Sequence, residues 1–259
     1  MRYSVLGAGK RLRAYLVFAC AEMYSVNKVS SYRVGSAVEM AHSFSLVHDD
    51  LPCMDDDDLR RGKPSTHVVF GESTAILAGN SLLSTAFEIL SNKQTHEVER
   101  VRLDLIKKFA QVVGPYGMCG GQLMDLSTEN SFGEQQIIKL QNMKTALMIS
   151  FCCEAGGILG EASSEDKNIL SIFGKEIGLV FQIVDDLLDI EGKVEDVGKR
   201  VRKDQSLGKS TLISLLGVEA SRKKAYSIQE TAVKKLNSHF GSKARRLAEI
   251  SDFILKRKI

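Results

Sequence analysis

The sequence predicts an all-α protein that forms one large helical domain. Apolar residues recur at the three- and four-residue spacing of a helix face through most of the 259 residues. The chain has only three prolines, at positions 52, 64 and 115, so few residues interrupt long helices. No segment shows a convincing strand pattern, and no internal repeat or low-complexity tract divides the chain. We therefore treat residues 1–259 as a single domain.

The first half of the chain contains four expected helices. Residues 11–24 place Leu12, Leu16 and Cys20 on one face. Residues 33–48 do the same with Val34, Val38 and other residues, and Pro52 stops that helix. A long apolar helix is expected at 73–91, and another at 97–114 ends where Gly-Pro follows.

The second half continues the helical pattern, and small residues mark where helices approach closely. The segment 117–126 contains three glycines, which indicates close packing against a neighbour. Residues 134–160 form one or two helices, and their "EAGGILG" end is small enough for tight contact. A helix at 165–190 is followed by a charged loop at 191–210. The chain closes with helices at 211–217, 219–239 and 242–256.

Composition excludes several classes of protein. Hydrophobic residues make up 44% and charged residues 26%, as in ordinary globular proteins. The net charge of +3 is too small to indicate nucleic acid as a partner. No run of 18 apolar residues predicts a membrane span, and the N-terminus has no signal-peptide core. Five cysteines without a CxxC pair indicate reduced thiols, and so a cytoplasmic protein.

Two acidic segments far apart in the chain are the main candidates for a functional site. The first, "SLVHDDLPCMDDDDLRRG" at 45–62, follows an apolar helix and contains six aspartates. The second, "FQIVDDLLDIEG" at 181–192, places Gln182, Asp185 and Asp189 on one side of a helix that is otherwise apolar. Carboxylates in an apolar helix need a cation or a hydrogen-bond donor. We name these segments the first and second aspartate clusters.

Two interpretations of the clusters stay open from the residues alone. The first cluster could be a hydrated acidic loop, and the second a buried ion pair or helix cap. Alternatively, the two could face each other and hold Mg²⁺, which prefers oxygen ligands and bridges carboxylates to substrate phosphates. The residue spacing for zinc is absent. Arginines and lysines that could bind the phosphate oxygens lie in several segments, although each alone would pass as a surface residue.

Six blocks in order resemble one family, the trans-isoprenyl diphosphate synthases. The first aspartate cluster resembles their first motif in its DDxxxxD form, and the second resembles their DDxxD motif. The segments "GAGKRLR", "GGQLMDL", "MKTALM" and "LGKSTL" match the remaining blocks, so the resemblance covers essentially the whole chain. It implies a helical bundle of the isoprenoid synthase type with a central active-site cavity. It also implies a Mg²⁺-dependent prenyltransferase, with about three ions per site.

The resemblance also implies roles for individual residues. The metal ligands would be the aspartates of the two motifs, Asp49, Asp50, Asp55, Asp185, Asp186 and Asp189. The allylic diphosphate would be contacted by Arg60, Lys144, Lys199 and Lys209. The metal-free isopentenyl diphosphate site would comprise Lys10, Arg13, His42 and Arg61. Thr145 and Gln182 would line the reacting carbons, where an oxygen can face positive charge.

The implied reaction is ionisation, condensation and elimination. Metal and cationic side chains withdraw the diphosphate, an allylic cation forms in an apolar cavity, and the alkene of isopentenyl diphosphate attacks it. Product length depends on Phe44 and Ser45, five and four residues before Asp49. In this family an aromatic residue at the position of Phe44 accompanies the C15 product, farnesyl diphosphate. A C20 product, geranylgeranyl diphosphate, is the alternative.

Other interpretations predict different features. A non-catalytic subunit of a heteromeric synthase usually lacks one aspartate motif, and both are present here. A class I terpene cyclase would not need Lys10, Arg13 and His42. Relative to the family pattern, Ala14 replaces a proline, Arg202 stands where glycine is common, and the first N-terminal helix is missing. A homodimer is the family expectation, with the helices at 73–91 and 97–114 as candidates for its interface.

Overall fold

The computed structural model describes residues 1–127, 132–191 and 211–257. The all-α prediction is confirmed. The α-helices are α1 (Arg2–Val5), α2 (Leu12–Glu22), α3 (Lys28–Asp49), α4 (Thr66–Phe70), α5 (Glu72–Ser91), α6 (Glu99–Val113), α7 (Met118–Leu126), α8 (Glu134–Gln141), α9 (Leu147–Leu159), α10 (Ser164–Glu191), α13 (Leu212–Leu216), α14 (Val218–Phe240) and α15 (Arg245–Leu255). A π-helical turn, η1 (Asn142–Ala146), precedes α9, and a 3₁₀ turn, η2 (Gly241–Ala244), precedes α15.

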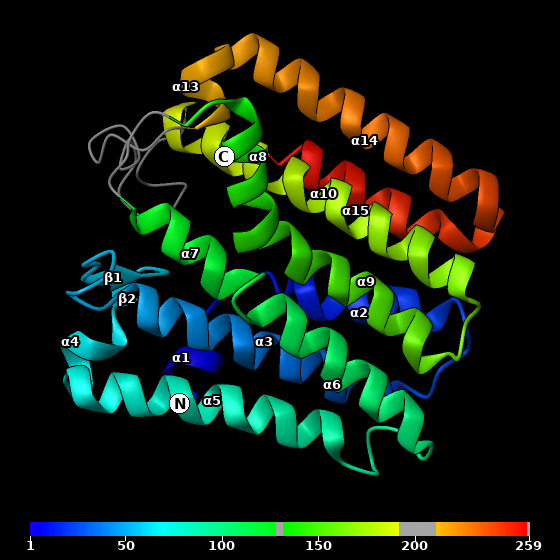
Figure 1. The fold of residues 1–259 in the computed structure, drawn as a ribbon, viewed down its shortest axis with the longest axis horizontal. Helices are drawn as coiled ribbons and strands as arrows, with labels where there is room; N and C mark the ends of the chain where they lie inside the picture. Colours follow the sequence, from blue (N-terminus) through cyan, green and yellow to red (C-terminus); the bar gives the residue numbers. More distant parts are fainter. Residues whose placement is uncertain (128–131, 192–210, 258–259) are drawn as a thin grey trace.

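The long helices pack side by side in an order that differs from the order in sequence. The neighbours run α5, α3, α2, α9, α10 and α14 across the molecule, from the cyan edge to the orange edge in Figure 1. Helix α6 packs against α5 and α9, and α15 packs against α10 and α14. This order brings α3, which carries the first aspartate cluster, and α10, which carries the second, into one bundle around α2 and α9.

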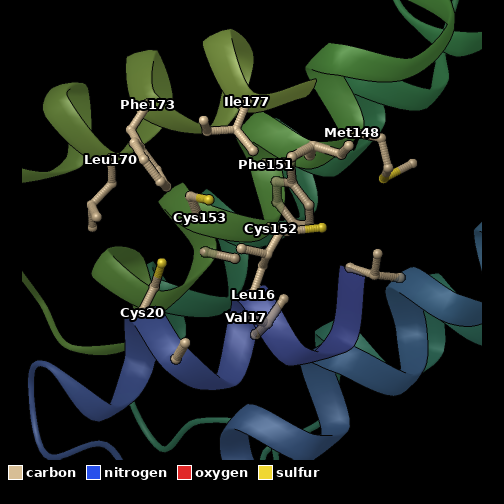
Figure 2. Packing of buried hydrophobic residues seen from close by; sticks show 14 of the residues in the cluster. Leu16, Val17, Cys20, Met148, Phe151, Cys152, Cys153, Leu170, Phe173 and Ile177 are labelled. Carbon is tan, nitrogen blue, oxygen red and sulfur yellow. The ribbon is translucent and has the colours of Figure 1, made fainter. Parts of the chain in front are cut away.

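Helix α9 lies at the centre of the core. Every residue from Met148 to Leu159 is buried, so the helix is apolar on all sides except at Ser150 and Glu154. Figure 2 shows its side chains between those of α2 and α10, with Phe151, Cys152 and Cys153 between Val17 and Phe173. All five cysteines of the chain are free thiols. A central helix packed this closely gives the polar residues around η1 a rigid support.

The structure adds elements that the sequence pattern did not predict. The expectation of no strand is wrong, because β1 (Leu59–Arg60) and β2 (Lys63–Pro64) form an antiparallel hairpin. The five-residue helix α4 follows it. The segment expected as one or two helices at 134–160 contains α8 and α9 joined by η1. Among the described residues, no helix is long and apolar enough to cross a membrane.

Candidate active site

The first aspartate cluster is held by the C-terminus of α3 and the loop that follows. Asp49 is the last residue of α3, and Asp50 caps the helix. The loop turns back on this end, because the amide of Asp55 donates to the carbonyl of Asp49 at 2.8 Å. The hairpin then brings Arg60 to Asp50, and its Nε donates to the carboxylate at 2.8 Å. Hairpin and helix end thus form one unit.

Burial raises the pKa of two carboxylates in this unit, those of Asp49 and Asp50. Desolvation is the main reason that the pKa of Asp49 rises to about 6; the carboxylates of Asp50 and Asp55 raise it further, and Lys144 and Arg60 oppose them. Burial also raises the pKa of Asp50, although its hydrogen bonds from Arg60 favour the charged form. Burial therefore makes the charged forms of Asp49 and Asp50 costly in the absence of a further positive partner. Such a site favours an additional cation.

The second aspartate cluster takes part in a chain of hydrogen bonds. The Thr145 hydroxyl donates to Oε1 of Gln182 at 3.1 Å, and Nε2 of Gln182 donates to Asp186 at 2.8 Å. The amide of Gln141 donates to the other Asp186 oxygen at 3.1 Å. Asp186 and Asp189 are buried, whereas the Asp185 carboxylate is about one-third exposed. These hydrogen bonds fix the Thr145 side chain and leave lone pairs of its hydroxyl oxygen free to face positive charge.

Lys144 lies in η1, where the helix geometry is irregular. A Cβ atom at position 121 would overlap the backbone of Lys144, so Gly121 lets α7 approach this turn closely. The Lys144 ammonium lies 2.6 Å from the Asp125 carboxylate, and it also affects the pKa of Asp49. Irregular turns of this kind frequently occur at functional sites. The expected close packing of 117–126 therefore orients a predicted site residue.

A set of cationic side chains gathers where α2, α3 and the hairpin meet. We name it the basic cluster, and it comprises Arg11, Arg13, His42 and Arg61, together with Lys10, which precedes Arg11 in the chain. Burial lowers the pKa of Arg13, against the opposing effects of Cys152, Glu39 and Asp185. Burial likewise lowers the pKa of His42 well below its usual range, and the neighbouring arginines lower it further. The imidazole is therefore neutral, and the guanidinium groups carry the positive charge of the cluster.

Sequence reasoning missed four partners of these residues. Asp125 pairs with Lys144, Gln141 donates to Asp186, and Glu39 lies within the basic cluster. Arg257 comes from the C-terminal tail, where its side chain is 7% exposed; its guanidinium lies 3.9 Å from Asp185 and 4.2 Å from the Phe181 ring centroid. Two of the four carried a signal in the sequence. Asp125 lies in the block "GGQLMDL", and Glu39 lies three residues before His42 on the same helix.

The remaining predicted residues have simpler surroundings. The Lys10 ammonium lies 5.9 Å from the ring centroid of Phe253. Phe44 is 9% exposed and packs edge-on against His48 at 4.7 Å, and Ser45 donates to the carbonyl of His42 at 3.0 Å. Lys199 and Lys209, and the departure at Arg202, lie outside the described residues.

The carboxylates around the site suit Mg²⁺. In the described residues, no three acidic, histidine or cysteine side chains converge as a ready-made metal cluster. The aspartate oxygens of the two clusters are nevertheless the donors that Mg²⁺ prefers, and proteins often hold it by one or two carboxylates together with substrate phosphates. The raised pKa of Asp49 indicates a carboxylate that a cation would stabilise. The donor set therefore fits this ion.

Comparisons with known proteins match nearly the whole chain to one family. The family model described as Polyprenyl synthetase matches residues 1–250. Farnesyl diphosphate synthase of Bacillus subtilis (strain 168) is 42% identical over 259 residues, which cover 99% of this chain and 87% of that protein. The apo structure of an FPP/GFPP synthase from Zymomonas mobilis has a TM-score of 0.89 at 42% identity, covering 98% of this chain and 86% of that one. A geranyltransferase structure from Helicobacter pylori, complexed with magnesium and isoprenyl diphosphate, has a TM-score of 0.85 at 30% identity, covering 98% and 84%.

Proposed function

Since the chain belongs to the polyprenyl synthetase family, we propose that it is a Mg²⁺-dependent trans-prenyltransferase. It condenses isopentenyl diphosphate with dimethylallyl diphosphate and then with geranyl diphosphate, and it releases farnesyl diphosphate and diphosphate. The full-length similarity to a farnesyl diphosphate synthase supports this activity.

The observation that carries the proposal is the meeting of two oppositely charged regions. Asp185, from the second aspartate cluster, contributes to the electrostatic environment of Arg13 in the basic cluster. Two diphosphates could therefore bind next to each other, one through metal on the aspartates and the other directly on cationic side chains. A reaction that joins two diphosphate substrates needs this division.

Residues of both aspartate clusters would hold Mg²⁺. The proposed ligands are Asp49, Asp50, Asp55 and Asp185, with Asp186 and Asp189 in support. Asp186 already accepts hydrogen bonds from Gln141 and Gln182, so we assign it mainly to orienting Gln182. When bound, the ion neutralises charge on the leaving diphosphate. A structure complexed with magnesium in this family supports the choice of metal.

Side chains of the protein then perform three tasks in the reaction. Arg60 and Lys144 bind oxygens of the leaving diphosphate as the carbon–oxygen bond of the allylic substrate breaks. Thr145, fixed by Gln182, directs oxygen lone pairs at the allylic cation. Lys10, Arg13 and Arg61 hold isopentenyl diphosphate so that its alkene forms the new carbon–carbon bond. A proton is then lost to the released diphosphate, so no protein nucleophile is required. Lys199 and Lys209, which lie outside the described residues, remain proposed contacts of the allylic diphosphate.

We assign farnesyl diphosphate as the product because of Phe44. Its ring packs on His48, and Nε2 of His48 lies 3.1 Å from the carbonyl of Ile76 on α5. This contact ties His48, and through it the Phe44 ring, to α5. In the proposed binding mode the ring would limit the length of the prenyl chain that grows beside α3. The name of the Zymomonas protein includes both FPP and GFPP, so the similarity alone leaves the length open.

The first experiment sizes the products. Purified protein with Mg²⁺, isopentenyl diphosphate and dimethylallyl diphosphate should give a C15 alcohol after phosphatase treatment. We expect Phe44→Ala to shift the products to C20 or longer, because removing a buried ring leaves a cavity that the chain can enter. Phe240→Ala, which removes a ring on α14, serves as the control and should keep C15. A C20 product from the unaltered protein would retain the enzyme class and overturn the role of Phe44.

We further propose that the protein is a cytoplasmic homodimer. Helices α5 and α6 present apolar side chains to solvent, and Leu77 and Leu103 are 66% and 65% exposed. A second copy would cover them. The five free cysteines support a reducing compartment.

A further inference from the structure

Glu39 is a buried carboxylate inside the basic cluster. It lies in the middle of α3 and is 7% exposed. Its Oε2 accepts a hydrogen bond from Nη1 of Arg11 at 3.2 Å, and its Oε1 accepts one from the backbone amide of Ala14 at 3.3 Å. It also lies close enough to Arg13 and Arg61 to favour their charged forms. One negative charge thus faces several positive ones.

The two hydrogen bonds of Glu39 hold the start of α2. Arg11 is the N-cap residue of α2 and has a positive φ of 50°, and its own side chain makes no cap bond. The first turn of a helix has amide groups without intrahelical partners, and a negative charge there is favourable. Glu39, on α3, provides both a hydrogen-bond acceptor and a negative charge for the first turn of α2, because its carboxylate accepts a hydrogen bond from the Ala14 amide.

Arg11 extends this support to the preceding loop. Its Nη2 donates to the carbonyls of Val5 and Gly7, each at 2.6 Å. Arg11 is therefore engaged with protein atoms, and in the proposed site substrate binding falls to Lys10 and Arg13, which precede and follow it in the sequence. The Nε of Arg13 is buried and has no hydrogen-bond partner within the described part of the chain. Glu39 anchors the residue around which these two cations are arranged.

We propose that Glu39 is a positioning residue for the isopentenyl diphosphate site, acting through Arg11 and the N-terminus of α2. The inference rests on the proposed function of the basic cluster. Glu39 offsets the repulsion among the arginines before the substrate binds, and it fixes the loop that carries Lys10. Its carboxylate faces cations rather than the diphosphate, so it does not take part in the chemistry.

The test compares Michaelis constants for the two substrates in the Glu39→Gln variant. Glutamine keeps the shape but has one acceptor oxygen and no charge. We expect KM for isopentenyl diphosphate to rise at least about tenfold, since loss of a buried charge partner has effects of this size. KM for dimethylallyl diphosphate should stay within about threefold. The opposite result, an unchanged or lower KM for isopentenyl diphosphate, would mean that removing negative charge matters more than positioning, and would overturn the proposal.

Glu154→Gln is the matched control. Glu154 is 8% exposed, pairs with Lys108 at 2.9 Å and accepts from Ser171 at 3.1 Å, all outside the basic cluster. Both variants should lower the melting temperature, but only Glu39→Gln should separate the two KM values. Equal changes of both KM values in the two variants would reduce Glu39 to a structural role. If Glu39→Gln does not fold, Glu39→Asp, with its shorter reach, takes its place under the same criteria.

Lys10→Ala distinguishes failure of this inference from failure of the proposed site. Lys10 contacts only the ring of Phe253 among the interactions given above. If Lys10→Ala raised KM for isopentenyl diphosphate and Glu39→Gln left it unchanged, only the role of Glu39 would be overturned. An unchanged KM in Lys10→Ala would show that the basic cluster is not the isopentenyl diphosphate site, and both proposals would fall.

Discussion

Helix α3 supplies residues to two charged regions that balance their charge in different ways. Near its middle, Glu39 and His42 belong to the basic cluster, where a buried carboxylate offsets the arginines. At its end, Asp49 and Asp50 belong to the first aspartate cluster, where burial raises the pKa of both carboxylates despite Arg60. In the basic cluster one carboxylate offsets several cations, whereas in the aspartate cluster Arg60 pairs with Asp50 and the pKa of Asp49 stays raised.

The difference indicates how each region is prepared for a diphosphate. Cationic side chains bind phosphate oxygens directly, so the basic cluster needs a fixed arrangement and receives it from Glu39. Carboxylates repel phosphate, so the aspartate cluster can bind a diphosphate only through a metal ion. The arrangement of the basic cluster is built into the protein, whereas that of the first aspartate cluster depends on Mg²⁺. Three sets of substitutions test the contrast.

Asp185→Asn should have the largest effect. Asp185 lies 3.9 Å from Arg257 and within the electrostatic influence of Arg13 in the basic cluster. Removing its charge should lower kcat about 100- to 1,000-fold, the range for loss of one group that stabilises transition-state charge. The measurement is steady-state condensation at saturating Mg²⁺. Asp104→Asn, an exposed aspartate 4.0 Å from Arg100, should have no effect. A variant that keeps a tenth of its activity would exclude Asp185 from the metal site.

The neighbours Arg60 and Arg61 should separate the two regions. Arg60 bonds to Asp50, whereas Arg61 lies in the basic cluster, and a Cβ atom at Gly9 would come 2.9 Å from its Nη1. We expect Arg60→Met to raise KM for dimethylallyl diphosphate, and Arg61→Met to raise KM for isopentenyl diphosphate, each about tenfold or more. Kinetics with one substrate varied at a time check this.

The free energy of unfolding should also distinguish Arg60→Met from Arg61→Met. Arg60→Met leaves Asp50 buried without its hydrogen-bond donor, which should cost about 2 kcal/mol of unfolding free energy. Arg61 has a pKa lowered by burial and then by Arg11, so its removal should be close to neutral. If both variants changed the same KM, the two regions would form a single binding site.

The fold could be predicted from the sequence to a large extent, because long helices have a strong apolar period. Each long helix expected at 11–24, 33–48 and 165–190 is present, with ends shifted by a few residues. The hairpin was missed because its strands are two residues long and lie in a highly charged segment. The short helix α4 also offers too few residues for a periodic pattern.

The site was predictable where its residues form a local pattern, and not where they meet through folding. The aspartates and Lys144 belong to motifs that can be recognised along the chain. Arg257, in contrast, lies more than 70 residues from Asp185, in a tail that resembles an exposed basic end. Which cation pairs with which carboxylate depends on helix packing, and no spacing in the sequence encodes it.

The smallest expected effect concerns stability of the metal-free protein. The pKa of Asp49 in the folded protein is about 6, above its ordinary value of 3.8. As pH rises from about 4, the unfolded chain therefore loses this proton first, and the folded state loses stability until about pH 6. The shift corresponds to about 3 kcal/mol at most, which solvent screening reduces to about 1–2 kcal/mol. Asp49→Asn should thus raise the melting temperature in EDTA at pH 7.5 by about 2–6 °C. Near pH 4 the same substitution should leave the melting temperature unchanged.

Asp50→Asn is the contrasting variant, because the same substitution one residue later removes a charge that Arg60 needs. Burial raises the pKa of Asp50, and Asp50 in turn raises the pKa of Arg60; we expect the direct hydrogen bonds from Arg60 to decide the outcome. The melting temperature of this variant should therefore fall. Mg²⁺ should stabilise the unaltered protein and do so less in either variant, since ligands that bind only the folded state raise its stability. If both variants melted higher by the same amount, Arg60 would not balance Asp50, and the aspartate cluster would lack any counter-ion of its own.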